Sequence, residues 1–91
     1  MYFETTEEMV KDIATRFKKI RKAKRVTQVD LAKQSNVSYG TIKRFETSGE
    51  ISLHNLIKLC VALDIVDEVR NLFNNISFKN IDEVIRYERY N

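Results

Sequence analysis

Residues 27–49 read TQVDLAKQSNVSYGTIKRFETSG, and this stretch predicts two short helices joined by a tight turn. Thr27 is suited to begin the first helix, because a threonine hydroxyl can accept a backbone N–H that has no partner within the helix. Asn36 can adopt the left-handed conformation that ends a helix sharply. Ser38 is suited to begin the second helix and Gly49 to end it. Both predicted helices are therefore bounded by residues that favour helix ends.

The predicted second helix has an inner and an outer side. Ile42 and Phe45 are three residues apart, which places both on the buried side. The other faces are left to Tyr39, Gly40, Thr41, Lys43 and Arg44. An outward surface that is uncharged at the start of the helix and then cationic suits a DNA groove.

The same stretch resembles the lambda-repressor-like, or Xre-type, helix-turn-helix family, whose signature is T-Q, L-A, a turn, V-S, I, and E followed by G. The matching residues are, in order, Thr27-Gln28, Leu31-Ala32, Val37-Ser38, Ile42, Glu46 and Gly49. The sequence departs from the signature in two places: Asn36 replaces the turn glycine, and one extra residue separates Glu46 from Gly49. The resemblance implies an all-α fold, a lambda-repressor-like five-helix DNA-binding domain.

The resemblance also implies roles for individual residues. The family's contacts to base edges fall on Tyr39, Gly40, Thr41 and Arg44, and an arginine can bond to both O6 and N7 of guanine. We expect contacts to DNA phosphates from Gln28, Ser38, Lys43 and Lys24, and we expect Gln28 also to support the recognition helix. Arg21 and Glu46 match a pair that joins the first helix to the recognition helix, so we assign them a structural role. Two alternatives stay open: Tyr39 as a partly buried aromatic that closes the turn, and Lys43 as a solvated side chain.

The composition bounds the class of protein. Ninety-one residues make one small domain, and the absence of Pro with only two Gly favours helices. The single Cys60 excludes an intramolecular disulfide and does not make a zinc site. The sequence shows no nucleophile–base set, metal cluster or glycine-rich phosphate loop, so we expect no enzyme activity, cofactor or metal. No apolar run approaches the ~20 residues of a membrane span, and the start, MYFETTEEM, is acidic, so we expect a soluble cytoplasmic protein.

The net charge of +3 hides an uneven distribution. Residues 16–44 contain ten Lys or Arg and one acidic residue, Asp30, whereas residues 1–15 and 45–91 each carry −3. A basic block between acidic ends is typical of a polyanion-binding face. The alternative is a solvated cationic helix, since the helix dipole favours cations near a C-terminus. The charge does not exclude RNA, but no platform of interleaved aromatic residues is evident.

The rest of the chain predicts further helices. The first, over about 6–24, has a core stripe of Val10, Ile13, Phe17 and Ile20. A fourth begins at Ser52, with an inward face of Leu53, Leu56, Ile57, Cys60 and Leu63. A fifth covers about 66–73, with an inward face of Val69, Leu72 and Phe73. Residues 74–78 predict a short extended segment, and a terminal helix follows from Asn80.

We assign residues 1–75 to the DNA-binding domain and residues 76–91 to a C-terminal tail. The apolar residues of the tail would be surplus on a monomer, so we expect a dimer or partner contact at Ile76, Phe78, Ile81 and Ile85. Residues 45–65 and 72–87 are also similar to HipB-like antitoxins, which are paired with HipA-like kinase toxins. In that group a tail strand commonly pairs across a homodimer.

These features predict a sequence-specific transcriptional repressor that binds a palindromic operator in double-stranded DNA as a homodimer. The narrower resemblance implies an autoregulatory antitoxin with a HipA-like toxin as its partner. The alternative is a stand-alone phage-type repressor or restriction-system controller with no toxin partner. A large kinase-like reading frame beside the gene would favour the antitoxin.

Overall fold

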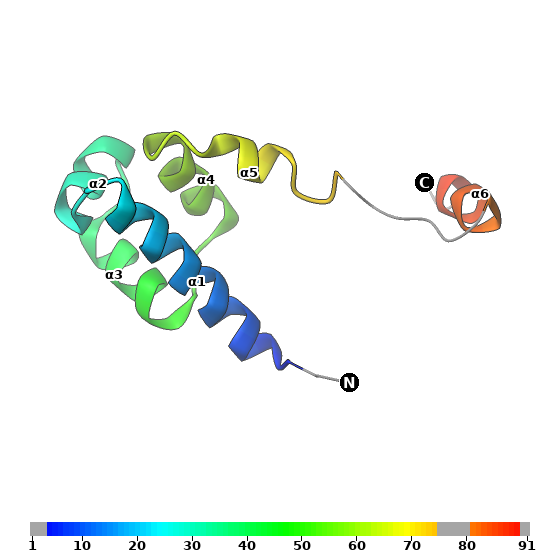
Figure 1. Cartoon of the computed structure of the whole chain (residues 1–91), viewed down its shortest axis with the longest axis horizontal. Helices are drawn as coiled ribbons and strands as arrows, with labels where there is room; N and C mark the ends of the chain where they lie inside the picture. Colours follow the sequence, from blue (N-terminus) through cyan, green and yellow to red (C-terminus); the bar gives the residue numbers. More distant parts are fainter. Residues whose placement is uncertain (1–3, 75–80, 90–91) are drawn as a thin grey trace.

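The computed structural model describes residues 4–74 and 81–89, which contain six α-helices and no β-strand (Figure 1). The helices are α1 (Thr6–Ala23), α2 (Gln28–Ser35), α3 (Tyr39–Ser48), α4 (Leu53–Ala62), α5 (Val66–Arg70) and α6 (Ile81–Arg89). The predicted all-α fold is confirmed, and its terminal helix is α6. The extended segment predicted over 74–78 lies, from residue 75 on, outside the described residues. None of the helices in the described ranges is long and apolar enough to cross a membrane.

The first four helices each begin where the sequence offers a hydroxyl. In every case that oxygen accepts the backbone N–H three residues on, over 3.0 to 3.1 Å, and the capping residues are Thr5, Thr27, Ser38 and Ser52. A cap of this kind contributes ~0.5–2 kcal/mol to stability. The contribution matters most for α2 and α3, because helices of eight and ten residues are marginal in isolation.

The hydrophobic core connects α1 through α5. Helices α1 and α2 both pack against α3, while α4 packs against α2 and α5. The buried core residues are Ala14, Phe17, Leu31, Val37, Ile42, Phe45, Leu59, Cys60 and Leu63. Phe17 on α1 and Phe45 on α3 meet edge to face, with ring centroids 5.2 Å apart, an arrangement that aromatic pairs prefer. Helix α3 is thus held from its inner side by two neighbours.

The predicted core stripe of α1 is wrong in its N-terminal half. Val10 and Ile13 are 40% and 45% exposed, and the buried face is formed instead by Ala14, Phe17 and Arg21. The N-terminal turns of α1 extend beyond the other helices of the domain (Figure 1). At Val10 the helix is still in contact with α3, because Gly49 lies against the Val10 backbone, and the end of α3 covers the Val10 side chain only in part.

The inward faces predicted for α4 and α5 also need correction. On α4, Leu53 is 61% exposed and Leu59 is fully buried. The α4 sequence carries apolar residues on two faces, and periodicity alone does not say which of them is buried. Helix α5 ends at Arg70, and the two residues predicted to point inward beyond it, Leu72 and Phe73, are 54% and 79% exposed.

Candidate nucleic-acid interface

The turn between α2 and α3 sets the direction of α3. Asn36 has φ 59° and ψ 29°, the left-handed conformation that ends α2. Val37 is buried in the core, and its N–H donates to the hydroxyl of Ser35 over 3.1 Å. The hydroxyl of Ser38 then accepts the N–H of Thr41 and begins α3. Since these three successive residues are each held by the fold, α3 leaves the turn at a fixed angle to α2.

Helix α3 presents a buried side and an exposed side. Ile42 and Phe45 are 0% and 1% exposed, so they anchor the helix in the core. Thr41 is half-buried, whereas the exposed residues among those predicted to face DNA are Tyr39, Gly40, Lys43 and Arg44. Four of the five outward residues therefore lie on the free side of a helix that is anchored from behind.

Gly40 leaves open space on the exposed side of α3. A Cβ atom added at this position would meet no heavy atom within 4 Å. The packing of the domain therefore does not demand glycine here. A position without a side chain lets the backbone of α3 come close to another molecule.

The first turn of α3 contains two further side-chain contacts. The Lys43 ammonium lies 5.3 Å from the centroid of the Tyr39 ring, within range of a cation–π interaction. The hydroxyls of Ser38 and Thr41 are 2.7 Å apart and share a hydrogen bond. Tyr39 is 45% exposed, so its ring lies at the surface beside Lys43.

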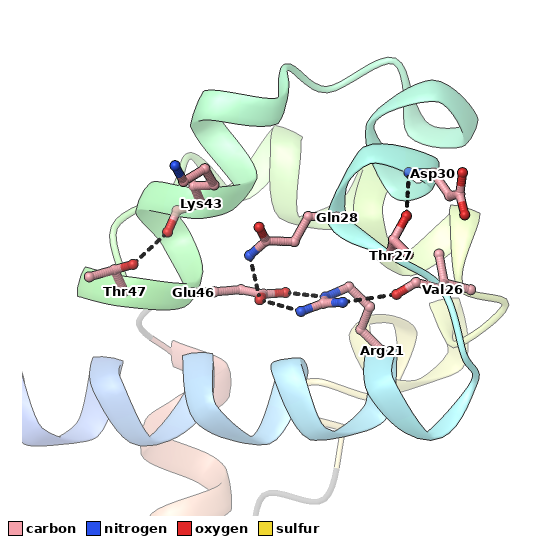
Figure 2. A network of polar contacts seen from close by, with 8 residues as sticks. All are labelled: Arg21, Val26, Thr27, Gln28, Asp30, Lys43, Glu46 and Thr47. Carbon is pink, nitrogen blue, oxygen red and sulfur yellow. Dashed lines mark hydrogen bonds and ion pairs between the residues drawn. The ribbon is translucent and has the colours of Figure 1, made fainter.

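A buried polar network joins α3 to α1 and α2 (Figure 2). Arg21 donates from Nε and Nη2 to the two carboxylate oxygens of Glu46, over 2.7 and 2.8 Å. Its third nitrogen, Nη1, donates to the carbonyl of Val26 over 2.9 Å. Gln28 donates its amide N–H to Glu46 over 2.9 Å. The side chains of Arg21 and Glu46 are only 7% and 2% exposed, so this bidentate pair fixes the position of α3 from inside the domain.

The network also sets the charge state of its members. Burial by itself would raise the pKa of the Glu46 carboxyl, but the hydrogen bonds from Arg21 and Gln28 and the nearby positive charges lower it below its ordinary value. The hydrogen bond to Glu46 raises the pKa of Arg21. Glu46 is therefore a carboxylate and Arg21 a cation at neutral pH.

The remaining predicted residues lie in different surroundings. Gln28, at the start of α2, was expected to bind a phosphate and to support the recognition helix, and its amide donates to Glu46 of α3. Lys24 follows the last residue of α1 and is exposed. In the tail, Ile85 is 43% exposed. Ile76, Phe78 and the side chain of Ile81 lie outside the described residues.

One contact of α3 was not predicted from the sequence. Arg44 donates from Nη2 to the carboxylate of Glu50 over 2.8 Å. Glu50 lies beyond Gly49, outside the helix, and the residue spacing of helix pairs therefore gave no signal for it. Both side chains are largely exposed, at 72% and 65%, and both line an open hollow of about 590 Å³ beside α3.

Helices α2 and α3 are joined by a tight left-handed turn, and α3 is buried on one side and carries exposed cations on the other. This arrangement defines a helix-turn-helix DNA-binding domain. A family model described as helix-turn-helix, of the lambda-repressor or Xre type, matches residues 17–70. The match covers more than half of the chain, so the protein belongs to this family of DNA-binding transcription regulators. Searches of curated proteins and of solved structures found no significant match.

Proposed function

We propose that this regulator is a sequence-specific repressor that acts as a homodimer and places α3 in the major groove of its operator. The observation that carries the proposal is the placement of α3. Its inner side is fixed by the core and by the Arg21–Glu46 pair, while Tyr39, Gly40 and Arg44 remain exposed. A recognition helix must be held rigidly and still offer free donors to the base edges.

The candidate DNA contacts divide into residues that would contact bases and residues that would bind phosphates. Arg44 would donate to O6 and N7 of guanine, a contact worth ~1–3 kcal/mol of discrimination. Gly40 would let the helix approach the bases closely, and Tyr39 and Thr41 would meet base edges or thymine methyl groups. The phosphate contacts fall to Ser38, Lys43, Lys24 and the free part of the Gln28 amide, and these position the protein without reading sequence.

A homodimer supplies a second recognition helix, which would bind the second half-site of the operator. One recognition helix reads only a few base pairs, so two copies would bind half-sites about 34 Å apart on a palindrome. We assign residues 1–75 to DNA binding and residues 76–91 to the contact between copies. The exposure of Ile85 supports this assignment, because an apolar side chain on a helix of the tail is available to a partner.

We further propose that the protein is an autoregulatory antitoxin of a HipA-like kinase toxin. The resemblance of residues 45–65 and 72–87 to HipB-like antitoxins supports this proposal. The exposure of Leu72 and Phe73 after α5 fits a second protein interface. The alternative is a stand-alone repressor with no toxin, and a pull-down with the product of the neighbouring gene distinguishes the two.

The experiment that tests repression is a measurement of binding to DNA from upstream of the protein's own gene. Fluorescence anisotropy at two salt concentrations would compare this DNA with random duplexes of equal length. We expect tighter binding to the upstream DNA, a steep loss with salt, and a loss of preference in Arg44→Ala. Arg70→Ala is the matched control, since it removes an equally exposed cation from α5. Equal, weak binding of all duplexes would contradict an autoregulatory repressor.

A further inference from the structure

The contact between Arg44 and Glu50 is tied to the backbone at both ends. The Ser48 hydroxyl donates to the carbonyl of Arg44 over 2.8 Å and accepts the N–H of Glu50 over 3.2 Å. The Glu50 carboxylate in turn accepts from Arg44 Nη2 over 2.8 Å. These three hydrogen bonds close a ring that runs through both the backbone and the side chains of Arg44 and Glu50. Gly49, with φ 85°, makes the turn that brings Glu50 back beside Arg44.

Such a ring restricts the guanidinium more than an ordinary surface ion pair does. An exposed pair contributes little to stability, because two long side chains must lose rotamer freedom to meet. Here the backbone of Glu50 is already placed by Ser48, so fewer torsions have to be fixed for the carboxylate to meet Arg44. The consequence of the pair is therefore the orientation of Arg44 and not the stability of the fold.

The geometry leaves Arg44 able to bind guanine while it is held. A guanidinium carries five N–H donors in a fixed plane. The bond to Glu50 uses one of them, and a bidentate contact to O6 and N7 of guanine needs two. The same guanidinium can therefore bridge Glu50 and a base, provided that its plane points into the groove.

The negative charge of Glu50 also favours contacts with bases over contacts with phosphates. A carboxylate beside Arg44 cancels much of its attraction for a phosphate, which is the contact available on every DNA sequence. It does not weaken the directional hydrogen bonds that guanine accepts. A paired Arg44 therefore gains less from random DNA than a free arginine would.

We propose that Glu50 is a specificity-determining residue that positions Arg44 for guanine and suppresses its contact with phosphates. This inference rests on the proposed DNA-binding role of α3. It adds the residue through which the preference of Arg44 for guanine is enforced.

The test begins with selection of preferred duplexes from a randomised library by the wild-type protein. Anisotropy with the selected duplex and its single-base variants then gives the base preference at each position. The position whose guanine preference disappears in Arg44→Ala is the one that Arg44 reads. We expect Glu50→Gln to reduce that preference by at least about threefold and to raise affinity for random DNA by about two- to fivefold.

Two variants separate positioning from a simple change of charge. Ser48→Ala opens the ring but keeps every charge, and we expect it to reduce the guanine preference without raising random binding. Asp67→Asn removes a carboxylate from another exposed ion pair, on α5, and we expect wild-type preference. In the Arg44→Ala background, Glu50→Gln should no longer affect base preference at that position.

The possible failures are distinguishable. If the wild type selects no duplex, the proposed sequence-specific function fails. If it selects one but Arg44→Ala changes no position, or if Glu50→Gln and Ser48→Ala both keep full guanine preference, sequence-specific binding stands and the role of Glu50 is overturned.

Discussion

The two glycines of the chain differ in what a side chain would meet. At Gly49, with φ 85°, an added Cβ would lie 2.7 Å from both the carbonyl carbon and the carbonyl oxygen of Val10. The end of α3 can approach α1 this closely only without a side chain. At Gly40 an added Cβ would meet nothing within 4 Å. The fold therefore requires glycine at position 49, at the end of α3, but not at position 40, in its first turn.

We expect Gly40→Ala to separate folding from DNA binding. Alanine favours a helix over glycine, so the free energy of unfolding should stay the same or rise by up to ~1 kcal/mol. Affinity for the selected duplex should fall about tenfold or more, because the methyl group occupies the space between α3 and the bases. On the same preparation, thermal denaturation measures the stability and fluorescence anisotropy measures the affinity for the duplex. Wild-type affinity in Gly40→Ala would remove this residue from the DNA-facing surface.

Gly49→Ala is the contrasting variant. It combines a left-handed alanine with a clash against the backbone of α1, and we expect it to lose ~2–4 kcal/mol of stability.

At the scale of the helices, the network of Arg21, Gln28 and Glu46 holds α1, α2 and α3 at one point (Figure 2). Glu46→Gln should lower the free energy of unfolding by about 3–5 kcal/mol at neutral pH, because it leaves the charge of Arg21 buried without a counter-ion. DNA binding should weaken with it, since α3 loses its fixed position. Gln28→Ala is the milder control, because it removes one hydrogen bond to the same carboxylate and leaves the ion pair.

The same network predicts a dependence of stability on pH. The pKa of Glu46 is lower in the folded protein than its ordinary value of 4.5, so the unfolded chain binds the proton more readily. The stabilisation by Glu46 is thus complete above that value and is lost as the pH falls through the folded pKa. Urea denaturation between pH 7 and pH 3 should show the difference between wild type and Glu46→Gln narrowing below about pH 4.5. A constant difference over this range would show that the carboxylate does not titrate with folding.

Helix ends were predicted better than helix faces, and the reason is physical. A cap such as Thr27 or Ser38 acts on a backbone group three residues away, so the sequence contains the whole interaction. Burial depends on which neighbour covers a face. Val10 and Leu53 follow a helical spacing, but the sequence does not show how much of Val10 the end of α3 covers or which side of α4 meets α2.

The candidate site divides in the same way. The exposed front of α3 follows from the burial of Ile42 and Phe45, which spacing predicts. The ring that holds Arg44 depends on the left-handed turn at Gly49 and on a hydroxyl bonded in two directions. The sequence indicates that Gly49 ends the helix, but it does not show that Ser48 bonds in both directions or that Glu50 returns to Arg44, so the pair was not predicted.

At the scale of the whole molecule, the family match ends at residue 70, and the chain continues to residue 91. The described residues beyond the match include three large apolar side chains, Leu72, Phe73 and Ile85, all more than 40% exposed. The packing between described helices joins α1 to α3, α2 to α3 and α4, and α4 to α5. The packed core of α1 through α5 thus lies within residues 4–74, and the side chains of Leu72, Phe73 and Ile85 are not buried in it.

We therefore expect truncation after Asn75 to separate dimerisation from folding. The truncated chain keeps α1 through α5 with their packing, so its melting temperature at high dilution should match that of the full chain. Its dimer dissociation constant should rise at least about tenfold, because burying apolar side chains between two copies drives association.

Sedimentation over a range of concentrations measures the constant, and Ile85→Asp in the full chain tests the same contact without removing α6. Binding to a palindromic duplex should weaken in both variants, since each copy then holds a single half-site. Unaltered dimers in both would place the interface within residues 1–75, where the exposed face of α4 formed by Leu53 and Val61 would be the next surface to test.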